Sequence, residues 1–161
     1  MLISFDSLPD HSRIWIYPSN RKLSEQEIFL VKERTTEFLT QWTAHGADLM
    51  AGFDLPYDRF LVIGLNQDQA AASGCSIDAS VRFIQSLQEE LGIDLLDKMN
   101  VTFYSGDFIA HKSLIEFKKM AKNKSVSRNT VVFNNLVNTK EEYLNYWEVP
   151  AHESWHNRFL P

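Results

Sequence analysis

The sequence contains a single cysteine, Cys75, among its 161 residues. An internal disulfide and a cysteine-based zinc cluster are therefore both excluded. Glycine and proline are also scarce, with 6 and 5 residues, so collagen-like and low-complexity classes do not apply. Hydrophobic residues make up 44% and charged residues 23%, close to globular averages, and the chain is long enough to bury a substantial core.

Long apolar runs are missing as well. The longest, Phe60 to Leu65, is six residues long, whereas a membrane-spanning helix needs about 20. The first ten residues carry two acidic and no basic side chains, which is not the pattern of a secretory signal. We therefore expect a soluble, cytoplasmic protein that has no membrane partner.

Negative charge dominates the chain as a whole but not its last third. The 16 basic and 21 acidic residues give a net charge of −5, which argues against non-specific binding of nucleic acid. Residues 1–111 hold 8 basic and 16 acidic side chains, whereas residues 112–161 hold 8 and 5. Much of this difference is a local cluster with one acid, Glu116, among its cations: Lys112, Lys118, Lys119, Lys122, Lys124 and Arg128. Isolated basic runs are weak motifs, and a solvated surface is the simplest explanation for this one.

Hydrophobic periodicity predicts the element order strand, helix, strand, strand, helix, strand. The expected strands are 13–17, 48–54, 59–65 and 101–104, and the expected helices run from Ser24 to His45-Gly46 and from Ser76 to Gly92. Ser24 and Glu27 have the spacing of a capping box at the start of the first helix. Ser76 is expected to cap the second helix.

This order is typical of a ferredoxin-like split βαβ sandwich (βαββαβ), which is an α+β fold. Residues 13–104 are expected to form an antiparallel sheet in the spatial order four, one, three, two, with both helices on one face. A C-terminal αβα extension, 105–161, adds a helix after Ser113, a strand at 131–137 and a helix after Thr139. Because a free tail would expose its many aromatic residues, we expect the extension to pack on the sandwich, so that residues 1–161 form a single domain.

The predicted topology gathers several candidate site residues at one end of the sandwich. The start of the first strand, the end of the first helix and the N-terminus of the second helix meet there. The residues at these positions are Arg13, His45, Cys75, Ser76 and Asp78. Free amides and the positive dipole end of a helix favour anions. We therefore expect a small-ligand or anion site at the second helix, with Arg13, Ser76, Asp78 and Arg82 as ligand-binding residues.

A thiol function is the alternative at the same place. The helix dipole and an imidazolium from His45 would favour the thiolate of Cys75, which a thiol-dependent hydrolase or transferase requires as its nucleophile. The competing explanation is structural, because cysteine is commonly buried and histidine suits a helix C-terminus. Asn134 and Asn135 are unusual within a strand, and they either satisfy buried backbone groups or face a pocket as further ligand-binding residues.

The segment His152-Glu153-Ser154-Trp155-His156 matches the pattern H-E-x-x-H. On a helix this pattern places two imidazoles on one face for zinc, with the glutamate as general base. Its context is poor, because it begins two residues after Pro150 and no Asp, Glu, His or Cys follows it. A zinc hydrolase is therefore the weakest functional alternative. We expect no metal at His152 and His156, and no cofactor.

Four segments carry a resemblance to a known family: Gln41–Gly46, Ser73–Asp78, Phe133–Val137 and Trp147–Pro150. The chain resembles a family of bacterial proteins of about this length that are often labelled ATPases of ABC transporters. That label implies a P-loop, G-x-x-x-x-G-K-[ST], yet none of the six glycines is followed by lysine. The partners left open are a small anionic ligand or a protein, including a second copy in a homodimer.

Overall fold

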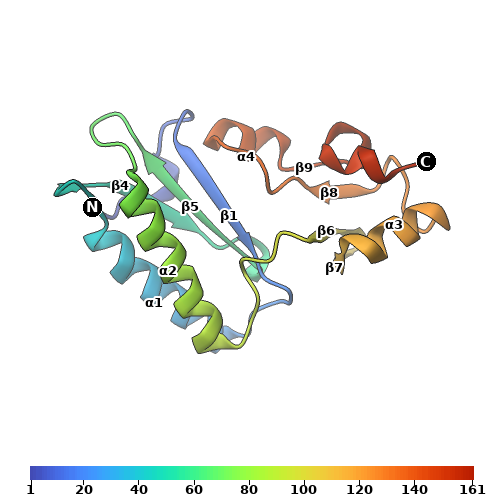
Figure 1. The fold of residues 1–161 in the computed structure, drawn as a ribbon, viewed down its shortest axis with the longest axis horizontal. Helices are drawn as coiled ribbons and strands as arrows, with labels where there is room; N and C mark the ends of the chain where they lie inside the picture. The colour runs from blue at the N-terminus through green and yellow to red at the C-terminus, as the bar shows by residue number, and fades with distance from the viewer. The chain divides into compact units, whose positions relative to one another are not determined.

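The computed structural model describes residues 1–161 as a mixed α+β structure (Figure 1), which confirms the predicted fold class. The chain divides into two compact units. The first consists of Met1–Leu96 and Asn138–Glu141, and the second of Asp97–Val137 and Glu142–Pro161. That these units form a single domain stays a prediction. No helix combines the length and apolar character needed to cross a membrane.

A three-stranded antiparallel sheet in the order β1–β5–β4 is at the centre of the first unit. Its elements are β1 (Arg13–Pro18), α1 (Glu25–Gln41), β4 (Met50–Asp54), β5 (Phe60–Asn66) and α2 (Gly74–Leu91), with a small hairpin of β2 (Thr43–Ala44) and β3 (Ala47–Asp48). On the central strand, Ile63 lies opposite Trp15 on one side and Phe53 on the other. The predicted order of strands one, three and two is thereby confirmed.

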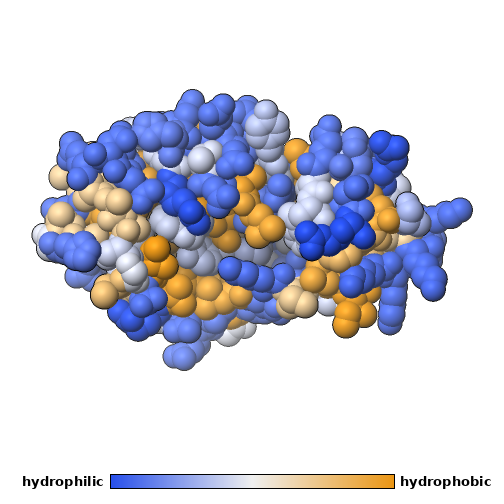
Figure 2. Space-filling model, turned by 45° about the horizontal axis from the view of Figure 1, so that its top comes forward, coloured by the Kyte–Doolittle hydropathy of each residue, from blue (hydrophilic) through white to orange (hydrophobic).

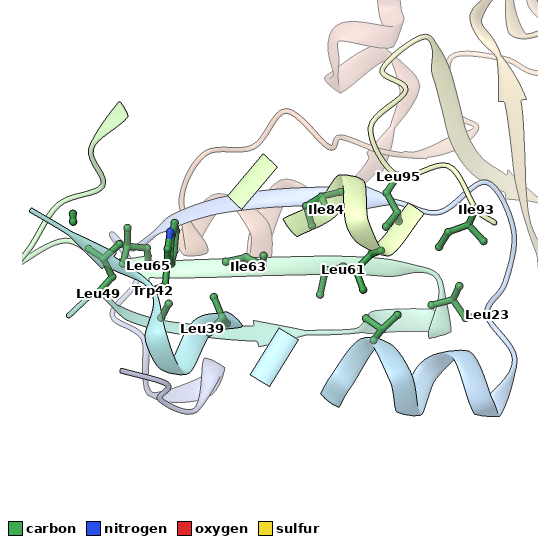
Figure 3. Close-up of a cluster of buried hydrophobic side chains, with 14 residues drawn as sticks. Leu23, Leu39, Trp42, Leu49, Leu61, Ile63, Leu65, Ile84, Ile93 and Leu95 are labelled. Atoms are coloured by element: carbon green, nitrogen blue, oxygen red, sulfur yellow. The ribbon is translucent and has the colours of Figure 1, made fainter. Parts of the chain in front are cut away.

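Both helices cover the same face of this sheet, as predicted. The β5 side chains that alternate onto this face, Leu61, Ile63 and Leu65, are at most 2% exposed. They pack in one core with residues of both helices, among them Val31, Leu39, Ile84 and Leu87. Figure 3 shows Trp42, Leu49 and Leu65 together at one end of this core. Removing these side chains from water is the main stabilising contribution to the unit.

The opposite face of the sheet is covered by the N-terminal segment. A Cβ atom on Gly52 of β4 would lie 2.6 Å from the backbone carbonyl oxygen of Ile3, so a side chain there would force the N-terminal segment away from the sheet. Lys140 is buried, and its Nζ donates hydrogen bonds to the carbonyl oxygens of Asp6 and Leu8, at 3.1 and 2.7 Å. These bonds hold the start of the chain to a segment more than 130 residues away in sequence.

The predicted fourth strand does not join this sheet. β6 (Asn100–Ser105) belongs to the second unit and pairs along its whole length with β7 (Phe108–Ser113). Gly106, with φ +63°, begins the two-residue turn between them. Closing such a short loop loses little entropy, and the other edge of β6 pairs with β8 (Val131–Phe133), so neither edge of β6 is left for β1. The strand order therefore does not confirm the ferredoxin-like topology.

The free edge of β1 makes a much smaller contact than a fourth strand would. Arg13 and Thr139 form an isolated antiparallel bridge, and the Ile14 amide donates to the Asn138 carbonyl oxygen at 2.9 Å. Residues 138–139 thus occupy the position beside β1 that the ferredoxin-like prediction gave to strand 101–104.

The second unit has its own antiparallel sheet, in the order β7–β6–β8–β9. Its other elements are α3 (Leu114–Lys122), β8 (Val131–Phe133), β9 (Glu148–Pro150) and the short 3-10 helices Ala151–Glu153 and Trp155–Phe159. The helix α4 (Lys140–Tyr146) begins in the first unit and belongs to the second from Glu142 onward. α3 buries Phe117 in a core with Phe103 and Val132, and Trp155 and Phe159 pack against this core. The aromatic end of the chain therefore packs within the second unit.

Candidate functional site

A cavity of about 500 Å³ in the first unit is lined in part by the first turn of α2. The end of α1 contributes Phe38 and Gln41, and the hairpin that follows contributes Thr43 and His45. Trp42, between them, completes an aromatic wall with Phe38. The helix side of the cavity is formed by Ser73, Cys75, Ser76 and Ala79. Three of the predicted site residues, His45, Cys75 and Ser76, therefore line a common cavity.

The N-terminus of α2 is capped by Ser73, whereas the sequence predicted a cap at Ser76. The Ser76 amide donates to Ser73 Oγ at 3.1 Å, and the Ser73 amide donates to Ser76 Oγ at 2.7 Å. This is a capping box in which serine takes the place of the usual Glu or Gln. The Ser-x-x-Ser spacing could have predicted the cap at Ser73, and the sequence analysis missed it.

The earlier cap changes the position of Cys75, which is the second residue inside the helix instead of the residue before its cap. The amides of Gly74 and Cys75 belong to the first helical turn, where no helix carbonyl is available to accept from them. The Cys75 side chain is exposed. The site thus presents a thiol and first-turn amides together.

His45 lies in a hairpin turn, whereas the sequence predicted that it lies at the C-terminal end of the first helix. α1 ends at Gln41, and Trp42 is already extended. His45 and Gly46 are the two central residues of the β2–β3 hairpin, with φ of +51° and +80°. Positive φ at both positions is typical of a type I′ turn. The exposed imidazole is carried into the cavity lining by this turn.

Trp42 fixes the aromatic wall to the helix. Its side chain is buried, and the indole Nε1 donates to the Ser76 carbonyl oxygen at 2.9 Å. The ring centre lies 5.5 Å from that of Phe38 and 6.1 Å from that of Trp15. Phe38 in turn stacks on Phe83 at 4.5 Å, with the rings 2° from parallel. Contacts on several sides hold the wall in one geometry.

Three of the predicted ligand-binding residues do not line the cavity. The Arg13 guanidinium lies over the Trp15 ring at 5.1 Å, where the interaction is cation–π. Asp78 and Arg82 are exposed on α2, outside the lining. The lining contains neither lysine nor arginine, and the helix terminus is the feature of it that favours an anion.

Asn134 and Asn135 belong to the second unit and lie in the turn after β8. The predicted strand 131–137 ends at Phe133 because this turn begins there. Asn134 Oδ1 accepts from the Leu136 amide at 3.1 Å, and Asn135 Oδ1 accepts from Trp147 Nε1 at 2.8 Å. Asn134 thus bonds an exposed backbone amide and Asn135 bonds a side chain, and neither residue lines the cavity at α2, so a ligand-binding role for them stays a prediction.

The H-E-x-x-H segment does not lie on one α-helix. Its residues are divided between two 3-10 helices by Ser154, which is extended. His156 is fully buried, with Nδ1 hydrogen-bonded to Ser154 Oγ and its ring 3.9 Å from that of Trp155. Burial lowers the pKa of His156 to about 4. No group of three or more His, Cys, Asp or Glu side chains in the structure is placed to hold a metal ion. The absence of zinc stays a prediction for metal analysis.

No family model matches the chain, and neither a curated protein nor a solved structure is similar to it at a significant level. The resemblance to the bacterial family therefore stays a prediction. The function has to be inferred from the cavity at α2.

Proposed function

We propose that the first unit is a binding module whose cavity at the N-terminus of α2 takes a small anionic ligand. The observation that carries the proposal is that the first turn of α2 is part of the lining of a cavity of about 500 Å³. Helix first turns stabilise negative charge through free amides and the dipole. The volume falls within the range of about 300–1,000 Å³ that is usual for small-molecule sites.

The lining favours one class of anion. Phe38 and Trp42 offer an apolar, aromatic surface, while Gln41 and Thr43 offer hydrogen bonds. A polyphosphate would need lysine or arginine to balance its charge, and the lining has neither. The lining is better suited to a ligand that has one negative charge and an apolar group, such as an aromatic carboxylate.

An NMR titration of the full chain with benzoate tests this proposal. We expect benzoate to shift the amide resonances of Gly74 and Cys75 and the indole resonance of Trp42 in a saturable way. Benzamide, which has the same ring but no charge, is the matched probe and should cause much smaller shifts. Equal responses to the two probes, or no response to benzoate at millimolar concentration, would contradict an anion site.

The alternative function is that of a thiol-dependent hydrolase or transferase. The observation that favours it is that Cys75 is exposed and lines the same cavity as His45. In such a reaction His45 takes the thiol proton while Cys75 Sγ attacks an acyl carbon. The leaving group departs with that proton, and water or another acceptor then cleaves the thioester.

Acylation followed by intact-mass measurement distinguishes the two functions. An enzyme should form an acetyl adduct at Cys75 with p-nitrophenyl acetate and should release acetate with turnover. His45→Ala should slow both steps. If the adduct forms at the same rate in His45→Ala and never turns over, the thiol function is contradicted and the binding function is not.

A further inference from the structure

Two helices of this chain present exposed faces of opposite charge, each with one exposed apolar side chain. We call the first the acidic face of α1, formed by Glu25, Phe29, Glu33 and Glu37, and the second the basic face of α3, formed by Ile115, Lys118, Lys119 and Lys122. Phe29 is 69% and Ile115 is 67% exposed. In Figure 2, apolar residues form several patches within a mainly hydrophilic surface.

The acidic face of α1 is a continuous stripe. Its four residues recur at four-residue steps, so they follow one another along the same side of the helix. The opposite side, with Val31 and Leu39, is buried in the core. None of the three glutamates of the face forms a salt bridge, since the ion pairs of α1 are made by Glu27 with Arg21 and by Arg34 with Glu90. The two cations of the helix are Lys32, which is exposed, and Arg34, whose pKa is raised first by its ion pair with Glu90 and to a smaller extent by the charges of Glu37 and Glu33.

The basic face of α3 has the same design with the charges reversed. Its residues are spaced by three, four and seven positions from Ile115, which places them on one side of the helix. The other side buries Phe117 and Ala121. None of the three lysines forms a salt bridge. Lys118 Nζ lies 5.0 Å from the Phe159 ring, which helps to hold its charge in place.

The charge contrast extends to the units that carry these helices. The first unit has 8 basic and 15 acidic residues, a net charge of −7, whereas the second has 8 and 6, a net charge of +2. A second copy of the chain therefore offers each face a partner of opposite sign. Complementary charge steers such an encounter and fixes its register.

We propose that the acidic face of α1 in one copy binds the basic face of α3 in another, so that the protein self-associates head to tail. Seating Phe29 against Ile115, with the two helices running in the same direction, places Glu33 opposite Lys119. Each of these residues lies four positions beyond the apolar residue of its face. One turn further on, Glu37 comes opposite Lys122.

Because the two surfaces differ, this interface is heterologous. Each added copy leaves one free acidic face and one free basic face, so association continues into open chains or closes into a ring. α3 has nine residues and is about 13 Å long, so the contact buries little area and is weak and transient. Its dependence on exposed charges makes it sensitive to salt.

Sedimentation velocity on the full chain tests the proposal. At low salt the weight-average mass should rise with concentration above the monomer value of 18.7 kDa. At about 1 M salt, where the Debye length is about 3 Å, the monomer should return. A mass that stays at the monomer value at every concentration and salt would overturn the proposal. This holds also if the two faces bind each other within a single chain, because that contact leaves the protein a monomer.

Charge reversal on each face identifies the interface. Glu33→Lys with Glu37→Lys should give a monomer, and so should Lys119→Glu with Lys122→Glu. A mixture of the two variants should again self-associate, with the two variants alternating, because the intact faces pair with each other and the two reversed faces are also of opposite charge. All four substitutions in a single chain should restore self-association.

Reversal elsewhere in the basic cluster is the matched control. Lys124→Glu with Arg128→Glu changes the net charge of the second unit by the same amount outside α3, and it should leave self-association intact. Equal loss in this control, or a mixture of the two face variants that stays monomeric, would refute the specific interface. Tight binding of a single-stranded oligonucleotide that Lys119→Glu with Lys122→Glu abolishes would assign the basic face to phosphate and would also overturn the proposal.

Discussion

His156 is a buried imidazole with a single hydrogen-bond partner. Its Nδ1 is bonded to Ser154 Oγ, while Nε2 is buried among aromatic rings without a partner. A positive charge on this ring would have to be stabilised without solvent, and burial lowers its pKa from 6.5 to about 4. The stability of the second unit is therefore linked to pH.

The sign of this linkage gives the first prediction. The unfolded chain binds a proton at His156 near pH 6.5 and the folded unit only near pH 4, so stability is full above pH 6.5 and falls between these values. We expect a loss of about 2–3 kcal/mol in the free energy of unfolding between pH 7 and about pH 4.5. In urea titrations, His156→Leu should remove most of this loss. An equal loss in the variant would contradict the assignment to His156.

Lys140 provides the second prediction at this scale. Replacing it with methionine keeps a long side chain but leaves the carbonyl oxygens of Asp6 and Leu8 without their buried donor. We expect a loss of about 1–3 kcal/mol in the free energy of unfolding. Amide exchange in residues 1–8 should become faster by local opening. Exchange in β5 should change only as much as the free energy of global unfolding does. Unchanged exchange in residues 1–8 would mean that Lys140 does not hold the N-terminal segment.

Among the elements, those defined by local patterns could be predicted from the sequence. The start of α1 is such a case, because Ser24 and Glu27 form the expected capping box. β7 was missed because neither set of alternating residues in Phe108–Ser113 is consistently apolar, so the period-two signal is weak. The pairing of β6 depends on that missed strand, and the predicted sheet failed at this point.

The candidate site divides in a similar way. The chain positions of His45, Cys75 and Ser76 allowed their convergence to be predicted, and one cavity includes all three. The contribution of Phe38 and Trp42 was missed, since apolar residues at helical spacing predict core packing only. The contact of Arg13 with Trp15 could not be predicted, because a sequence pattern does not determine which way a long side chain turns.

The β6–β7 turn is the element-scale prediction. Gly106 has φ +63°, and no atom lies within 4 Å of the position that a Cβ atom would take, so a substitution there tests backbone strain alone. Gly106→Val should destabilise the second unit by about 1–2 kcal/mol, and Gly106→Asn should have a smaller effect because asparagine tolerates this conformation. Amide exchange of β6 and β7 measures the difference. Equal effects of Val and Asn would rule out this account of the turn.

At the scale of the whole molecule, charge is separated between two units that have different surfaces. The more acidic first unit contains the cavity at α2, and the second unit contains the exposed basic helix α3. The net charge of the entire chain averages over this separation. It therefore indicated only that non-specific binding of nucleic acid is unfavourable, and gave no information about an interface between the two units' charged faces. The cavity is lined by the end of α1 and the start of α2, whereas the basic face lies on α3, so variants of α3 should leave ligand binding unchanged.

The first-turn amides of α2 are the centre of the functional account, and Gly74 allows one of them to be removed. Proline is favoured at the first helical position, and the preceding residue, Ser73, is already extended, with φ −103° and ψ 168°. A Cβ atom on Gly74 would have no atom within 4 Å. Gly74→Pro should therefore fold while lacking one amide hydrogen, and Gly74→Ala is the control that keeps it.

The most direct test is the dissociation constant of benzoate for the wild-type chain and these two variants, measured by NMR titration. Loss of one hydrogen bond to a charged ligand, about 1–2 kcal/mol, should weaken binding by roughly five- to thirty-fold in Gly74→Pro. Gly74→Ala should bind benzoate as the wild type does. Equal affinity in all three proteins would show that the Gly74 amide does not bind the anion, and would contradict the proposal that the first-turn amides of α2 hold it.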